Sequence, residues 1–154
     1  MDTLIDSQVL IRAHDSHAEP FAIAAILALR RLSETGQGAL SAQSLAEFAT
    51  YATYNFSLKR TVIAEQLELL GIVFPVLPIT AGIVAAAVRL ESRRRIGHYE
   101  AQVMAVAQAN GLKFILSEDR HNRWSRDDVV YLNFTRHANT RGWRARFPPS
   151  EAQA

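Results

Sequence analysis

The chain has 154 residues, of which 49% are hydrophobic and 21% are charged. This balance excludes a disordered chain and is typical of one soluble globular domain. The 17 basic and 15 acidic residues leave a net charge of only +2, so overall charge does not single out a polyanionic partner. Fifteen of the bases are arginine, which favours phosphate contacts or ion-pair networks, although genome composition could give the same bias.

Cysteine is absent from the sequence, which excludes disulfides and thiolate metal sites. The N-terminus carries Asp2 and Asp6 where a signal peptide would have basic and apolar residues. We therefore expect a cytoplasmic protein.

The first motif is a short apolar run, residues 3–5, that ends on Asp6 and is followed by apolar residues at helical spacing. This pattern predicts a strand that passes directly into a helix, with a carboxylate at the joint. Such joints in parallel α/β sheets lie at the edge where ligand sites form. Asp6 is therefore a candidate active-site residue; the alternative is that it only caps the helix.

Four further candidate carboxylates follow along the chain. Glu47 lies off the apolar stripe of a helix predicted around residues 45–56, and Glu100 lies in the first turn of a helix that begins near residue 98. A second apolar strand ends on Ser117, Glu118 and Asp119. Parallel strands share a carboxyl edge, so Asp6 and Asp119 could be neighbours, and a cluster of oxygen ligands suits Mg²⁺ or Mn²⁺.

Residues 69–88 form an uncharged stretch long enough to cross a membrane. Glycines and prolines divide it, so we expect a helix end, a strand over residues 73–77 and a new helix, with no membrane span. Pro75 within that strand indicates an edge position. Strands alternate with helices throughout, which predicts a three-layer α/β domain over residues 1–134 with a mainly parallel central sheet flanked by helices. Residues 135–154 form an Arg-rich tail.

Four motifs together resemble the PIN-domain ribonucleases, and most closely the VapC-type toxins of bacterial toxin-antitoxin pairs. They are residues 4–11 around Asp6, residues 45–48 around Glu47, residues 99–101 around Glu100, and residues 115–119, which end on Asp119. The resemblance covers roughly residues 1–134. It implies a metal-dependent endoribonuclease in which water attacks an RNA phosphodiester, a cognate antitoxin that holds the toxin inactive, and a homodimer.

The resemblance also implies residue roles. The catalytic, metal-binding acids would be Asp6, Glu47, Glu100 and Asp119, supported by Ser7, Gln8, Ser117 and Glu118. Two positions depart from the family, which generally has Asn at Gln8 and Asp at Glu100. Both changes lengthen a side chain by one methylene and put the activity, more than the fold, in question.

Arg93, Arg94 and Arg95 close a predicted helix. They either complement the carbonyl end of that helix or contact RNA phosphates beside the acids. The tail arginines around Trp143 could also hold RNA by charge and stacking, or the tail is an ordinary flexible terminus.

Other functions fit less well. Haloacid dehalogenase phosphatases need an Asp where this chain has Gln8, and receiver domains need an Asp after the strand at residues 73–77. The main rival is a PIN-like module that binds RNA or protein with weak or no catalysis. In the remaining alternative, the acids are only helix caps and surface charges.

Overall fold

The computed structural model describes residues 1–15, 17, 19–118 and 129–135. Asp119 and the Arg-rich tail lie outside the described residues. The elements in chain order are β1 (Thr3–Ile5), α1 (Ser7–His14), α2 (Glu19–Thr35), β2 (Gly38–Ser41), α3 (Ala42–Asn55), α4 (Arg60–Val73), β3 (Val76–Leu77), α5 (Ala81–Arg94), α6 (His98–Ala109), β4 (Phe114–Ser117) and β5 (Val130–Asn133).

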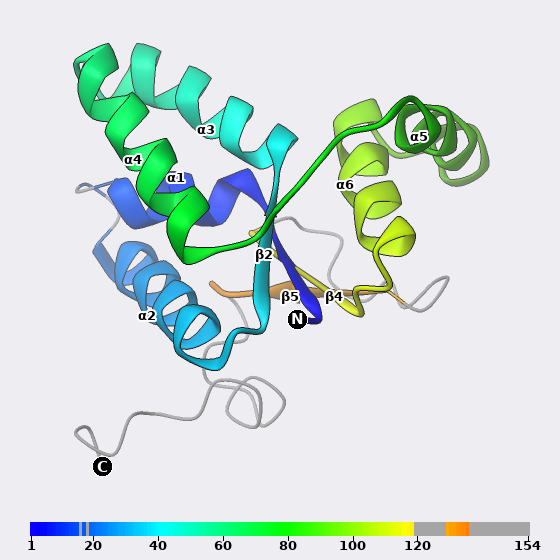
Figure 1. Ribbon diagram of the computed structural model, residues 1–154, viewed down its shortest axis with the longest axis horizontal. Helices are drawn as coiled ribbons and strands as arrows, with labels where there is room; N and C mark the ends of the chain where they lie inside the picture. The colour runs from blue at the N-terminus through cyan, green and yellow to red at the C-terminus, as the bar shows by residue number, and fades with distance from the viewer. Residues whose placement is uncertain (16, 18, 119–128, 136–154) are drawn as a thin grey trace.

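The strands form one sheet in the order β3-β2-β1-β4-β5, and every neighbouring pair is parallel. Helices α1 to α4 cover one face, and α5 and α6 cover the other (Figure 1). The predicted three-layer α/β architecture is therefore confirmed. Because β1 lies in the middle of the sheet, between β2 and β4, the residues that follow it have a strand end on each side.

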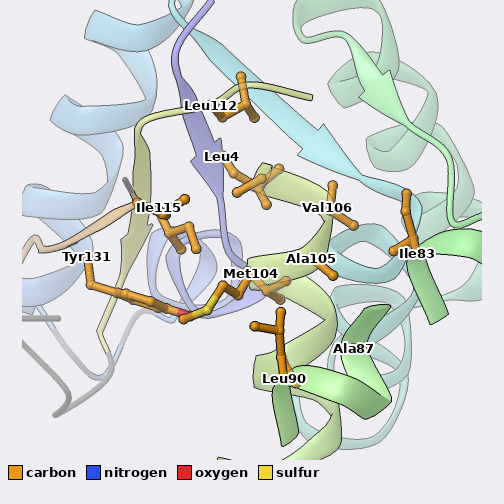
Figure 2. Close-up of a cluster of buried hydrophobic side chains, with 14 of the residues drawn as sticks. Leu4, Ile83, Ala87, Leu90, Met104, Ala105, Val106, Leu112, Ile115 and Tyr131 are labelled. Carbon is orange, nitrogen blue, oxygen red and sulfur yellow. The ribbon is translucent and has the colours of Figure 1, made fainter. Parts of the chain in front are cut away.

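Alternate residues of the central strands enter two separate apolar cores. Leu4 of β1 packs with α5 and α6, whereas its neighbour Ile5 packs with α1 to α4. Figure 2 shows the first core, in which Leu4 and Ile115 of the sheet meet Met104 and Val106 of α6. Both β1 residues are fully buried. A sheet covered on both faces needs such uninterrupted apolar strands, and these fix the strand ends where the site forms.

The strand predicted over residues 73–77 is wrong in its extent. Helix α4 continues through Gly71 to Val73, and β3 contains only Val76 and Leu77. Phe74, 4% exposed, ends the helix by turning inward. Pro75 has no N–H to offer a neighbouring strand, but its carbonyl accepts from the Leu40 N–H at 2.9 Å. The edge position of this segment is confirmed, since β3 ends the strand order.

The uncharged stretch at residues 69–88 is divided among the end of α4, β3 and the start of α5, as its glycines and prolines predict. Thr80 caps α5 by accepting from the Ile83 N–H at 3.3 Å. Within the described parts of the chain, no helix has both the length and the apolarity that a bilayer crossing requires.

Candidate active site

Asp6 lies where β1 passes into α1, at the carboxyl edge of the sheet. Its carboxylate accepts from the Ser7 N–H at 2.7 Å and from the Ser117 hydroxyl at 2.6 Å. Its own N–H donates to the Leu116 carbonyl at 3.0 Å, which extends the pairing of β1 with β4 by one residue. Asp6 is thus the N-cap of α1 and, at the same time, an acid at the junction of two strands. The capping interpretation is confirmed, and the role of Asp6 in an active site stays a prediction.

The pKa of Asp6 is raised to about 6. Burial, which disfavours the charged carboxylate, is the largest cause, and repulsion from Glu47 adds to it; the hydrogen bonds from Ser117 and Ser7 oppose the rise. Since no cation among the described residues pairs with Asp6, its ionised form gains from any positive charge placed beside it.

Glu47 reaches Asp6 through a serine. The Ser7 hydroxyl donates to Glu47 Oε2 at 2.6 Å and lies 3.4 Å from Asp6 Oδ1. The apolar stripe of α3 packs into the core through Phe48 and Ala52. Glu47, off that stripe, is therefore turned toward the end of β1 and is only partly buried. The sequence position that looked like a solvated surface carboxylate belongs to the same cluster as Asp6.

Gln43, which the sequence analysis did not identify, links two helices of the site. Its Nε2 donates to Glu47 Oε1 at 2.8 Å and to the Tyr99 carbonyl at 3.1 Å. The bonds fix the amide orientation, because both partners are acceptors. Its buried Oε1 has no hydrogen-bond partner in the described structure. The i, i+4 spacing of Gln43 and Glu47 in the sequence could have indicated the bond between them. Nothing in the sequence indicates the bond from Gln43 to the Tyr99 carbonyl on α6.

An open cleft of about 450 Å³ collects these groups. The residues that line it are Asp6, Ser7, Gln8, Gln43, Glu47, Tyr99, Glu100, Val103, Ser117, Glu118 and Tyr131. Among the predicted site residues, the structure therefore brings together Asp6, Glu47, Glu100, Ser7, Gln8, Ser117 and Glu118. Asp119 follows directly after Glu118 in the sequence but lies outside the described residues.

Tyr99 faces solvent, although its helical spacing from Val103 and Val106 predicts an inward position. It is 69% exposed at the start of α6 and contacts the His98 ring edge-on at 5.9 Å between centroids. Glu100, the next residue, is partly buried in the first turn of the same helix. An exposed aromatic ring therefore lies beside the acids in the lining of the cleft.

Glu118 is held by a cation that the sequence analysis also missed. Arg12 of α1 donates from Nε to Glu118 Oε2 at 2.6 Å and from Nη2 to Oε1 at 3.1 Å. This hydrogen bond is the main cause of the raised pKa of Arg12. Because the pair is bidentate, Glu118 ties α1 to the end of β4. Its role is to fix the position of the strand end that precedes Asp119.

Gln8 is exposed and lines the cleft, and its side chain makes no hydrogen bond in the described part of the chain. The arginines at the end of α5 are not among the described residues that line the cleft. Arg93 instead lines a second groove, and Arg95 adopts a left-handed conformation, with φ of 56°, that ends the helix. Arg93 therefore does not line the cleft itself, and its contact with RNA phosphates stays a prediction.

The described residues alone contain no group of three carboxylate or imidazole side chains close enough to hold a metal ion. The donor chemistry of the cleft nevertheless fits a hard cation. Its acids offer only oxygen atoms, which Mg²⁺ and Mn²⁺ prefer, and Asp6 has a raised pKa and no neutralising partner in the described structure. The fourth predicted acid, Asp119, follows the strand end that this cleft includes.

The PIN domain model matches residues 3–126 of the chain. The chain therefore belongs to the PIN-domain family, as its motifs predict. No curated protein sequence matches it.

Three solved structures share this fold. VapBC2 from Rickettsia felis, bound to a promoter DNA fragment, is 14% identical, with a TM-score of 0.63 over 86% of this chain and 98% of that one. A Klebsiella pneumoniae toxin-antitoxin complex is 21% identical, with a TM-score of 0.57 over 83% and 95%. Mycobacterium tuberculosis VapC20, a sarcin-ricin loop cleaving toxin, is 18% identical, with a TM-score of 0.60 over 77% and 91%. At these identities the similarity establishes the fold.

Proposed function

We propose that this protein is a metal-dependent endoribonuclease and the toxin of a toxin-antitoxin pair. The observation that carries the proposal is the hydrogen-bonded cluster of Asp6, Ser7, Glu47 and Ser117 in an open cleft. Membership of the PIN-domain family and the toxins among the similar structures support it.

In this proposal Asp6, Glu47, Glu100 and Asp119 hold Mg²⁺ or Mn²⁺. The bound ion would polarise the scissile phosphate and lower the pKa of the attacking water. The protein's own contribution is orientation. Ser117 and Ser7 occupy fixed lone pairs of Asp6, and Ser7 and Gln43 hold the two oxygens of Glu47. The carboxylates therefore keep their geometry without the ion, which limits the reorganisation that binding requires.

The substrate we propose is cytoplasmic RNA, with its backbone held in part by arginines of the 93–95 run. A cognate antitoxin would cover the protein between episodes of activity, and the active form would be a homodimer. The similar Klebsiella pneumoniae structure is a toxin-antitoxin complex, and VapBC2 from Rickettsia felis is bound to promoter DNA; both support the antitoxin partner.

The decisive test is cleavage of a mixed single-stranded and structured RNA pool by purified protein with Mn²⁺, with Mg²⁺ or with chelator. Asp6→Asn should lower the metal-dependent rate about 10²–10³-fold, the loss typical when a fixed electrostatic group is removed. The matched control is Lys59→Ala, because Lys59 is exposed and lies at the N-terminus of α4. This variant should cleave RNA at the wild-type rate. Cleavage that survives in chelator, or in Asp6→Asn, would contradict the proposal.

The second candidate is a PIN-like RNA-binding or protein-interaction module with weak or no catalysis. The observation in its favour is the unbonded Gln8 on the cleft lining, where the family has a shorter amide. Calorimetric titration with Mn²⁺ separates the two. Binding that disappears in Asp6→Asn supports the nuclease, and folded protein that takes up no Mn²⁺ supports the module. A Gln8→Asn variant that gains activity would identify Gln8 as the cause of a weak site.

A further inference from the structure

A second groove, of about 550 Å³, lies on the α5–α6 side of the sheet. Three of its described lining residues are basic: Arg89, Arg93 and Lys113. The others are apolar residues, a glycine and the amide Gln108, and no described lining residue is acidic. The sequence shows an arginine run but gives no reason to place Lys113 beside it. We name this feature, defined by its three cations, the basic groove.

The three cationic side chains are exposed, and none of them forms an ion pair or a side-chain hydrogen bond within the described structure. Arg89 and Arg93 are one turn apart on α5, so they share a helix face. Lys113 comes from the opposite wall, between α6 and β4. Like charges that converge without counter-charges repel one another. Their arrangement is stabilised when an anion with several charges lies between them.

The basic groove and the open cleft that contains the acids, here called the acid cleft, are both lined in part by residues of α6. Val129 lines the groove and Tyr131 lines the cleft, and both belong to the apolar core between the sheet and α5–α6. Two residues of strand separate them by about 7 Å. On α6, Val103 lines the cleft and Gln108 the groove, a rise of about 7.5 Å.

The two depressions share one apolar core. Tyr131, Met104 and Leu90 belong to the same buried cluster (Figure 2). Tyr131 belongs to the cleft and Leu90 to the basic groove. The linings of the two depressions thus come within a few residues of each other along the chain, a separation that an RNA strand of a few nucleotides can span.

We propose that the basic groove binds phosphates of the RNA substrate on one side of the scissile bond. This inference rests on the proposed function. It assigns backbone contacts to Arg89, Arg93 and Lys113, of which only Arg93 belongs to the arginine run. Phosphate contacts of this kind position the strand without reading its sequence, so the groove contributes affinity and register, and the acid cleft contributes the chemistry.

The test is binding of a fluorescein-labelled single-stranded RNA, followed by anisotropy in chelator over a range of salt concentrations. This arrangement leaves every cleft residue native and prevents metal-dependent cleavage. Arg89→Ala/Arg93→Ala should reduce the magnitude of the slope of log K against log salt by about 1.4, or about 0.7 for each lost phosphate contact. Affinity should fall about 5- to 20-fold, since exposed ion pairs contribute modestly. Adding Lys113→Ala should lower both values further.

Two variants control for charge and for folding. Lys59→Ala/Arg60→Ala removes two exposed cations around the start of α4, and it should retain the wild-type slope. Arg89→Lys/Arg93→Lys keeps the charges and should retain most of the slope. Alanine is a strong helix former, so α5 should stay folded, which thermal melting monitors.

Unchanged slopes in both the double and the triple groove variants, with wild-type protein that binds and cleaves RNA, would overturn the groove proposal alone. They would favour an acidic protein segment as the occupant. A slope change confined to the groove variants supports the proposal even if wild-type protein fails to cleave with Mn²⁺. That second result would refute the nuclease and not the groove. Wild-type protein that binds no RNA would overturn both.

Discussion

The acid cleft and the basic groove draw on the same apolar core, between the sheet and α5–α6, but are built on opposite principles. In the cleft, Asp6, Glu47 and Glu118 each accept from at least one described donor, so their positions are fixed. In the basic groove, no cation has a partner within the described structure. Fixed groups suit a reaction that needs defined geometry. Long, unbonded cations suit capture of a flexible polyanion.

The largest expected effect tests whether hydrogen bonding fixes the cleft. Gln43→Leu removes both bonds of the amide while keeping its approximate volume. We expect Mn²⁺ affinity to fall about 10- to 100-fold, as is typical when a group supporting a metal ligand is lost, measured by calorimetry. The free energy of unfolding should change little or rise, because the variant also removes the buried, unpaired Oε1.

The control for Gln43→Leu is Gln102→Leu, at a second buried glutamine on α6 that does not line the cleft. It should leave Mn²⁺ affinity unchanged. If Gln43→Leu lowers the free energy of unfolding by as much as it lowers the free energy of Mn²⁺ binding, Gln43 has only a structural role.

Tyr99 tests the contrast between the two regions, because its side chain is exposed although it lines the cleft, where the acids are held by hydrogen bonds. We expect its ring to stack on a base next to the scissile phosphate, a contact that costs about 1–3 kcal/mol on removal. Tyr99→Ala should weaken RNA binding by that amount with an unchanged salt slope, and Tyr99→Phe should bind as wild type. If Tyr99→Ala alters the salt slope as the groove variants do, the division between the two regions fails.

A smaller effect is the pH dependence of the metal-free protein. The pKa of Asp6 is about 6 in the folded state against an ordinary 3.8, so the folded state retains a proton that the unfolded chain releases between pH 4 and 6. The free energy of unfolding should therefore fall as pH rises through this window, by about 1–2 kcal/mol once partial exposure is allowed for. Denaturant titrations at pH 4 and 7 in chelator measure it.

Asp6→Asn is the comparison variant, since all other titrating groups are common to both proteins. Its stability should fall less between pH 4 and 7, and at pH 7 it should equal or exceed that of the metal-free wild type. An identical pH profile in the two proteins would contradict the assignment of the raised pKa to Asp6.

The layers, the parallel sheet and the joint at Asp6 were predictable because they depend on local patterns: an apolar run, a carboxylate, then helical spacing. The boundary between α4 and β3 was not predictable, because a short apolar run fits a strand and a helix end equally well. Glycine at position 71 did not stop the helix.

The contacts that complete the site were hidden for a different reason. Ser7 meets Glu47 across 40 residues of sequence, and Arg12 meets Glu118 across 106. Such pairs follow from tertiary packing, which no periodicity records. The exposure of Tyr99 was not predictable from its helical position. Its backbone carbonyl accepts from Gln43, a contact between distant residues, while its ring points outward.

The bond from Gln43 to the Tyr99 carbonyl spans the layers of the fold, since α3 packs on one face of the sheet and α6 on the other (Figure 1). The distance between Glu47 and Glu100 thus depends on how the two helical layers pack against the sheet. If warming loosens this packing, the two acids separate while each layer stays folded. The temperature at which activity is lost should therefore lie below the melting temperature.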